Sequence, residues 1–195
     1  MQKEAAVDND FVTHLSEIDN WEQKKLMETV KLLFDELNIS PVMHELVYTN
    51  ELNVLSDSSN IKKALLFFEN GIIKQKKIYD FLDTESKRKY YEMVFKEVYR
   101  DFKGNLPDSI KDIFKDWKKR ASLGETHTVV MCFMINCDIF LSDDSGSETL
   151  AKILRSKKAF DVKVYNREKA CERLKEIGST AINKTDRRVL KHKAK

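Results

Sequence analysis

Acidic side chains in the segment 122–151 have the types and spacing to bind a hard divalent cation. Glu125 lies at the start of a predicted apolar helix, and Asp143 and Asp144 end the predicted strand 139–144. Carboxylates that different elements bring to one edge of a sheet supply the oxygen ligands that such cations prefer. We therefore expect metal-assisted phosphodiester chemistry at these residues.

Two acids elsewhere in the chain are expected at the same place. Asp8 follows a predicted short strand near the N-terminus, and Glu51 lies on a helix predicted around 47–52. In an open parallel sheet, ligands bind beyond the carboxyl ends of the strands. Packed carboxylates repel one another and raise at least one pKa, so such a cluster is costly unless a cation binds it.

Purely structural interpretations of the same acids stay open. Ser122 and Glu125 have the spacing of a capping box, in which Glu125 would only satisfy N–H groups at a helix end. The residues 143–146, Asp-Asp-Ser-Gly, are also ordinary turn formers after a strand.

The second acidic position has a rival, and other polar residues are secondary. Glu45 is the alternative to Glu51, and Asp10 is a secondary candidate beside Asp8. The histidines are not expected to be ligands, because hard cations prefer oxygen. His127 is interpreted as a helix-surface or supporting residue, and His14 and His44 have no partners at ligand spacing.

Apolar periodicity predicts the elements that would position these acids. A short strand near the N-terminus runs into a loop, a short strand or loop is expected around 41–43, and a last short strand is expected at 162–165. Helices are predicted over 19–37, 147–157 and 168–177, and the aromatic-rich segment 60–119 reads as three more. Strands that alternate with helices indicate an α/β fold with a parallel, doubly wound sheet.

Composition narrows the class of protein. The 195 residues include only 5 Gly and 2 Pro, and 34% are charged, which favours a helix-rich globular chain. The three cysteines have no paired spacing typical of a zinc site or disulfide framework. No apolar run approaches the ~20 residues of a membrane span. We expect a cytoplasmic protein without membrane contact.

Positive charge is concentrated at the C-terminus. Residues 178–195 contain six lysines and arginines and a single acidic residue, Asp186, although the whole chain carries only +3. Such a basic tail is consistent with phosphate contacts to RNA. A solvated, mobile end is the alternative interpretation.

Taken in order, four motifs carry a resemblance to a known family. They are A-V-D-N-D-F-V, then P-V-x-x-x-L-V-Y-x-x-E-L, then L-G-E-T-H before an apolar helix, then C-D-I-F-L-S-D-D-S-G-S-x-x-L-A. Together they resemble the PIN-domain superfamily of metal-dependent ribonucleases, over residues 4–55 and 121–166. Among its members the chain is most similar to prokaryotic PIN-like predicted nucleic-acid-binding proteins.

The resemblance implies a fold, a site and an activity. It implies a parallel sheet of four or five strands between helices in a domain spanning 1–177, and hydrolysis of RNA with Mg²⁺ or Mn²⁺. The residues that match the family's acidic positions, catalytic and metal-binding, are Asp8, Glu51, Glu125 and Asp143, with Asp144 as a further metal ligand. Asp10 stands where the family usually has Asn or Ser.

One segment departs from the family pattern. The helical insertion at about 57–119 is longer than the usual helical pair, so it could cap a cleft, bind a protein partner or form a homodimer surface. The prediction is a divalent-metal-dependent endoribonuclease. The alternative is a noncatalytic PIN-like module that binds nucleic acid or protein.

Overall fold

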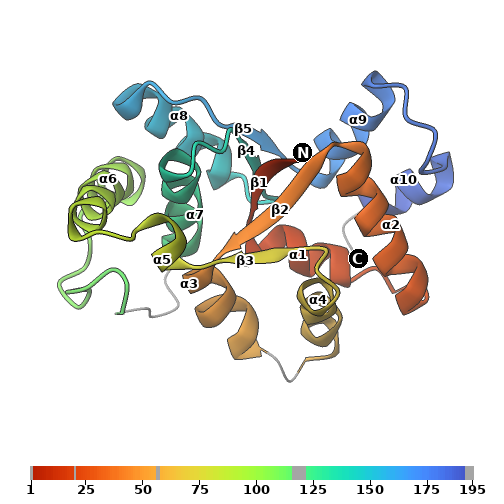
Figure 1. Cartoon of the computed structure of the whole chain (residues 1–195), viewed down its shortest axis with the longest axis horizontal. Coiled ribbons are helices and arrows are strands. Elements are labelled where there is room, and N and C mark those ends of the chain that lie inside the picture. The colour runs from red at the N-terminus through yellow and green to blue at the C-terminus, as the bar shows by residue number, and fades with distance from the viewer. Residues whose placement is uncertain (1, 20, 56–57, 116–121, 192–195) are drawn as a thin grey trace.

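A twisted sheet of five parallel strands forms the centre of the molecule (Figure 1). The computed structural model describes residues 2–19, 21–55, 58–115 and 122–191. The strand order is β3-β2-β1-β4-β5. The bounds are β1 (Lys3–Val7), β2 (Ile39–His44), β3 (Lys74–Lys76), β4 (Ile139–Leu141) and β5 (Lys163–Tyr165). The predicted α/β class, with a parallel sheet between helices, is confirmed.

Helices cover both faces of this sheet. One face packs against α1 (Asn9–Ser16), α2 (Gln23–Glu36), α4 (Ser59–Glu69), α9 (Arg167–Glu176) and α10 (Lys184–Lys191). The other packs against α5 (Ile78–Phe81), α6 (Glu85–Lys103), α7 (Leu123–Met134) and α8 (Gly146–Lys158). Short turns, α3 (Glu45–Val47), η1 (Tyr48–Leu52) and η2 (Asn53–Leu55), follow β2. No helix among the described residues combines the length and the apolar character that a bilayer span needs.

The central strands are apolar on both faces because each face is covered. Successive side chains of a strand point to opposite sides, so Ala5 and Val7 enter one core while Ala6 enters the other. Phe140 and Leu141 of β4 divide between the two cores in the same way. The sheet therefore separates two hydrophobic cores, and its carboxyl edge is left for polar residues.

The insertion predicted at about 57–119 is helical but also supplies a strand. Helices α4, α5 and α6 account for most of its described part, and β3 adds an edge strand beside β2. The sequence of β3 is Lys-Gln-Lys, without the apolar alternation that predicts strands, so sequence analysis missed it. Lys76 of β3 pairs with Glu4 of β1 at 2.8 Å. The end of the insertion lies outside the described residues.

A buried hydrogen-bond chain joins the insertion to the sheet. His44 Nδ1 accepts from the Leu46 N–H (3.0 Å), so its Nε2 carries the proton and donates to the Tyr91 hydroxyl at 3.2 Å. That hydroxyl donates to His127 Nδ1 (2.7 Å), and His127 Nε2 donates to the Ile113 carbonyl (3.1 Å). Both histidines are fully buried, and burial lowers the pKa of His44 to about 3. They are neutral structural residues, and His127 is not on a helix surface.

The C-terminal segment 178–191 is folded against the body of the protein. Ile182 and Leu190 are buried in the same core as α2 and α9. Lys25 of α2 pairs with Asp186 at 2.8 Å. The described part of this segment is therefore folded against α2 and α9 and is not a solvated end. The rest of the expected tail lies outside the described residues.

Candidate functional site

Asp8 lies where β1 ends, at the carboxyl edge of the sheet. Its backbone N–H donates to the carbonyl of Leu141 at the end of β4 (2.9 Å), which holds the two strand ends together. The carboxylate caps α1 by accepting from the Asn9 N–H at 2.8 Å and is only 3% exposed. The predicted loop after this strand is in fact the helix α1, which fixes Asp8 at its first turn.

Glu51 reaches the same region from the π-helical turn η1. A π-helical turn is rare and is frequently found at functional sites. The rival acid Glu45 lies elsewhere: it accepts a hydrogen bond from the Ile78 N–H (2.8 Å) and pairs with Lys77 at 3.5 Å. The structure thus places Glu51 near Asp8 and uses Glu45 to hold α5.

Glu125 lies in the first turn of α7, where its carboxylate interacts with the Ser122 side chain but no capping box forms. The N-cap residue Ser122 makes no side-chain cap hydrogen bond and has φ +80°, so the capping box is not formed. Glu125 is 8% exposed, and its Oε1 is buried without a hydrogen-bond partner among the described residues. Since buried polar atoms nearly always have partners, this oxygen requires an explanation.

Two glycines that sequence analysis did not single out make room for the carboxylates. A Cβ at Gly124 would lie 2.2 Å from Glu51 Oε1, so the Glu51 carboxylate packs directly against the first turn of α7. A Cβ at Gly146 would lie 3.2 Å from Glu125 Oε1 and 3.3 Å from Asp144 Oδ1. The missed signal was the glycine in L-G-E and in D-S-G-S, each in the first turn of a helix.

The adjacent acids Asp143 and Asp144 have different surroundings. Asp143 pairs with the buried Arg167 (Nε to Oδ2, 2.5 Å) and with His14 Nδ1 (2.8 Å), which holds its pKa below the usual range against the effect of burial. Asp144 is exposed and accepts from the Gly146 N–H at 2.7 Å, as in an ordinary turn. Asp144 faces Glu125, whereas Asp143 faces α1 and α9.

Mutual repulsion shows which acids are neighbours. Burial, then the charges of Asp10, Glu51 and Glu125, raise the pKa of Asp8 well above its usual range. Burial and then Asp10 raise the pKa of Glu51 to about 7. Burial, then Asp144 and Asp10, raise the pKa of Glu125 to about 7. Asp10, a secondary candidate in sequence analysis, therefore raises the pKa of all three of these carboxyl groups.

The acids are neighbours, but they do not form a closed ligand set. In the part of the chain that the structure describes, no three His, Cys, Asp or Glu side chains are arranged to hold a metal ion. The donor chemistry nevertheless fits a hard cation, since the neighbouring groups are carboxylates and Glu125 Oε1 is left without a partner. The glycine at each helix start provides the space into which these carboxylates fit.

The stability of the metal-free protein is expected to fall as pH rises. Folding raises the pKa of Glu51 and of Glu125 from 4.5 to about 7, so in this window the folded state binds more protons than the unfolded state. The free energy of unfolding should therefore decrease between about pH 5 and about pH 8, by up to roughly 3 kcal/mol for Glu51. Urea titrations in EDTA would measure this slope. A Glu51→Gln variant with the wild-type slope would contradict the assignment.

Comparisons with protein-family models, curated proteins and solved structures find no match to this chain. The strand topology establishes the fold, and the residues of the candidate site are the basis for any proposed function.

Proposed function

We propose that this protein is a divalent-metal-dependent ribonuclease of the PIN-like type that hydrolyses RNA phosphodiester bonds at the carboxyl edge of the sheet. The observation that carries the proposal is the unpartnered, buried Oε1 of Glu125, located among acids that raise one another's pKa. Repulsive, desolvated carboxylates destabilise the fold, and a bound cation would remove that cost.

Each acid has a proposed role set by its place. Asp8, Glu51 and Glu125 are the catalytic, metal-binding carboxylates, with Asp144 at the open side. Asp10 adds negative charge beside them, and Mg²⁺ or Mn²⁺ held there would activate water and stabilise charge on the scissile phosphate. Both carboxylate oxygens of Asp143, the fourth acid of the family pattern, already take part in hydrogen bonds with Arg167 or His14, so Asp143 would serve as a ligand only through a remaining lone pair.

The second candidate is a noncatalytic PIN-like module that binds nucleic acid or protein. It is favoured by the Asp143 ion pair and by the lack of an assembled metal group among the described residues. The two candidates differ in whether a cation binds and whether RNA is cut.

Metal binding can be tested by stability and by cleavage. Mn²⁺ at ~100 times its dissociation constant is expected to raise the free energy of unfolding by about 2.7 kcal/mol. End-labelled single-stranded RNA of mixed sequence should be cut with Mn²⁺ or Mg²⁺ and stay intact with EDTA. Unchanged melting across a wide Mn²⁺ titration, together with intact RNA, would exclude the ribonuclease and leave the noncatalytic module.

A basic hollow between α9 and α10 supports RNA as the partner. Its volume is about 580 Å³, and five cationic side chains line it: Lys175, Lys184, Arg187, Arg188 and Lys191. Arg187 Nε donates to the Ile182 carbonyl at 2.7 Å, which fixes one of these cations in place. Among the described residues, no carboxylate lies within ion-pair distance of Lys175, Lys184 or Arg188. An RNA backbone would supply the missing negative charge.

Removing two cations from this hollow is expected to weaken RNA binding in a salt-dependent way. For Lys184→Gln/Arg188→Gln, the slope of log binding constant against log salt should flatten by about 1.4, or 0.7 per lost phosphate contact. Fluorescence anisotropy with labelled single-stranded RNA in EDTA measures binding without cleavage.

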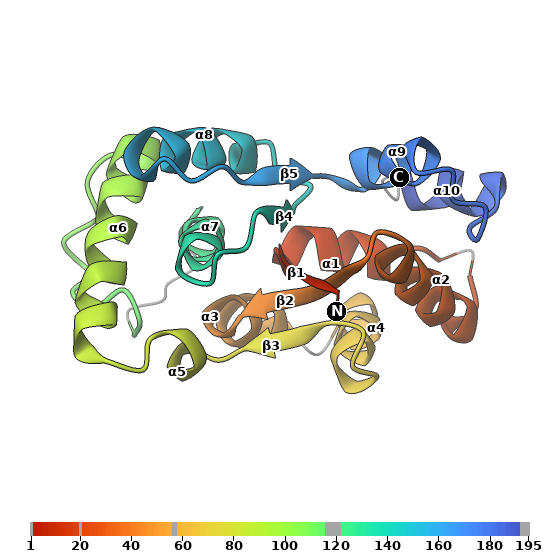
Figure 2. The same ribbon diagram turned by 45° about the horizontal axis from the view of Figure 1, so that its top comes forward.

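A matched variant separates this surface from total charge. Lys89→Gln/Lys96→Gln removes the same charge from exposed positions on α6, at the opposite end of the molecule from α10 (Figure 2). For this variant, the slope of log binding constant against log salt should stay close to that of the wild type. Equal slopes for the two double variants would mean that RNA does not contact the hollow.

A further inference from the structure

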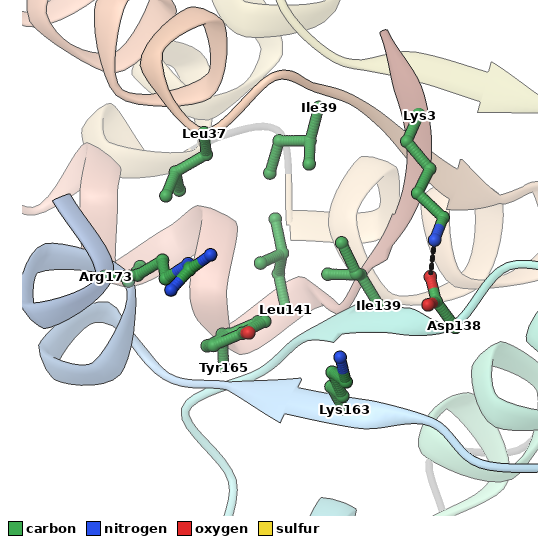
Figure 3. A pocket seen from close by; sticks show the side chains of 10 residues that line it. Lys3, Leu37, Ile39, Asp138, Ile139, Leu141, Lys163, Tyr165 and Arg173 are labelled. Carbon is green, nitrogen blue, oxygen red and sulfur yellow. Dashed lines mark ion pairs between the residues drawn. The ribbon is translucent and has the colours of Figure 1, made fainter. Parts of the chain in front are cut away.

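A second cavity lies over the strands on the face of the sheet that α2 and α9 cover. It has a volume of about 200 Å³ and is bounded by residues of β1, β2, β4 and β5, the end of α2 and one side of α9. Ile39, Ile139 and Leu141 form apolar walls, and Leu37 closes one side (Figure 3). An apolar ligand body would therefore contact side chains already in place on the sheet.

Polar groups in this cavity are positioned by the strand register and by α9. Lys163 and Tyr165 are two residues apart on β5, so both side chains project on the same face of the sheet. Arg173 extends from α9 toward the same space, beside the Tyr165 ring (Figure 3). Two cations and a phenol ring thus face one small volume.

The charges around the cavity are unequally balanced. Lys3 is neutralised by Asp138 at 2.7 Å, on the side away from Arg173 (Figure 3). Arg173 pairs with Glu176 at 2.8 Å, but both side chains are about half exposed or more, and such surface pairs contribute little. No carboxylate among the described residues pairs with Lys163. The cavity therefore has an excess of positive charge at its rim.

Volume restricts the size of a ligand. An apolar cavity of about 150 Å³ accommodates benzene, and typical drug-sized pockets range over about 300–1,000 Å³. A cavity of about 200 Å³ has room for a single six-membered ring with a small anionic substituent. We propose that the pocket formed by Lys163, Tyr165 and Arg173 over Ile139 and Leu141 binds a small aromatic carboxylate, with its ring on the apolar wall and its carboxylate between the two cations.

Benzoate is the probe that tests this proposal, by protein-observed NMR in EDTA without RNA. Benzoate should shift the signals of the lining residues saturably, with a dissociation constant on the order of 1 mM for so few atoms. Acetate lacks the ring and benzyl alcohol lacks the charge, so each should bind at least about tenfold more weakly.

Variants identify the pocket. Lys163→Gln and Arg173→Gln should each weaken benzoate binding about tenfold and leave the weaker binding of benzyl alcohol unchanged. Lys152→Gln, an exposed lysine of α8 on the other face of the sheet, is the control and should bind benzoate as the wild type does.

Three outcomes would overturn the proposal: no saturable shift at about ten times that concentration, equal binding of acetate, or wild-type affinity in both cation variants. The assay contains neither metal nor RNA, so its failure is independent of the ribonuclease proposal.

Discussion

Replacing Glu125 by glutamine is expected to reduce metal-dependent RNA cleavage by about 10³-fold, equivalent to ~4 kcal/mol of transition-state stabilisation. Glutamine keeps the volume and one oxygen of the side chain but removes the charge that a cation would neutralise. The same change removes a desolvated charge with a raised pKa, so the metal-free protein should become more stable by about 1–3 kcal/mol.

This pair of opposite effects distinguishes a functional acid from a structural one. Cleavage of end-labelled RNA measures the loss, and urea unfolding in EDTA measures the gain. The matched control is Glu45→Gln, which changes the rival glutamate that binds the Ile78 N–H and should keep full cleavage. Undiminished cleavage by Glu125→Gln would remove this residue from the site.

The Asp143→Asn variant is expected to destabilise the protein by about 3–5 kcal/mol, because the buried Arg167 guanidinium loses its carboxylate partner. Arg167 is 2% exposed, and Asp143 receives its Nε–H and backbone N–H at 2.5 and 3.0 Å. Arg167 also donates to the His14 carbonyl at 3.2 Å, so the pair connects α9, α1 and the end of β4.

Urea unfolding of Asp143→Asn and of Asp143→Leu/Arg167→Met measures this effect. The double variant removes both charges of the pair and should recover much of the lost stability. A loss below about 1 kcal/mol in the single variant would mean that the pair is open to solvent. Loss of cleavage in Asp143→Asn alone would therefore report on stability as much as on chemistry, so Glu125 is the cleaner test of the site.

The acidic edge could be predicted from sequence because strand ends set it. Asp8 directly follows an apolar strand, and Glu125 lies at the start of an apolar helix. In a parallel α/β fold, strand ends and the starts of the connected helices lie at the same edge of the sheet, so the two acids come together. The distinction between Asp143 and Asp144 could not be predicted, because it depends on Arg167, 24 residues further along the chain. Adjacent acids after a strand look alike until their partners are known.

The local sequence pattern did not predict three elements, β3, α10 and α1. Strand β3 is Lys-Gln-Lys, and it is held in the sheet by parallel pairing with β2. Helix α10 has a basic sequence with Val189 and Leu190 as its apolar residues, so it reads as a solvated tail. Helix α1 begins inside a D-N-D sequence that is typical of loops, with Asp8 as its cap and with Phe11 and Leu15 buried on one face. In each case tertiary packing, and not the local sequence pattern, determines the secondary structure of the segment.

The hydrogen-bond chain from His44 through Tyr91 to His127 makes the insertion and the sheet open as one cooperative unit. Separating α6 from the sheet would break the hydrogen bonds of the Tyr91 hydroxyl to His44 and His127, and losing a buried hydrogen bond costs about 1–3 kcal/mol when a partner stays desolvated. Amide protons of α6 and β2 should therefore exchange with solvent through the same global unfolding event rather than through independent local openings. A chain shortened by deleting the insertion would lose this shared stability, so the segment cannot be exchanged between proteins as a detachable module.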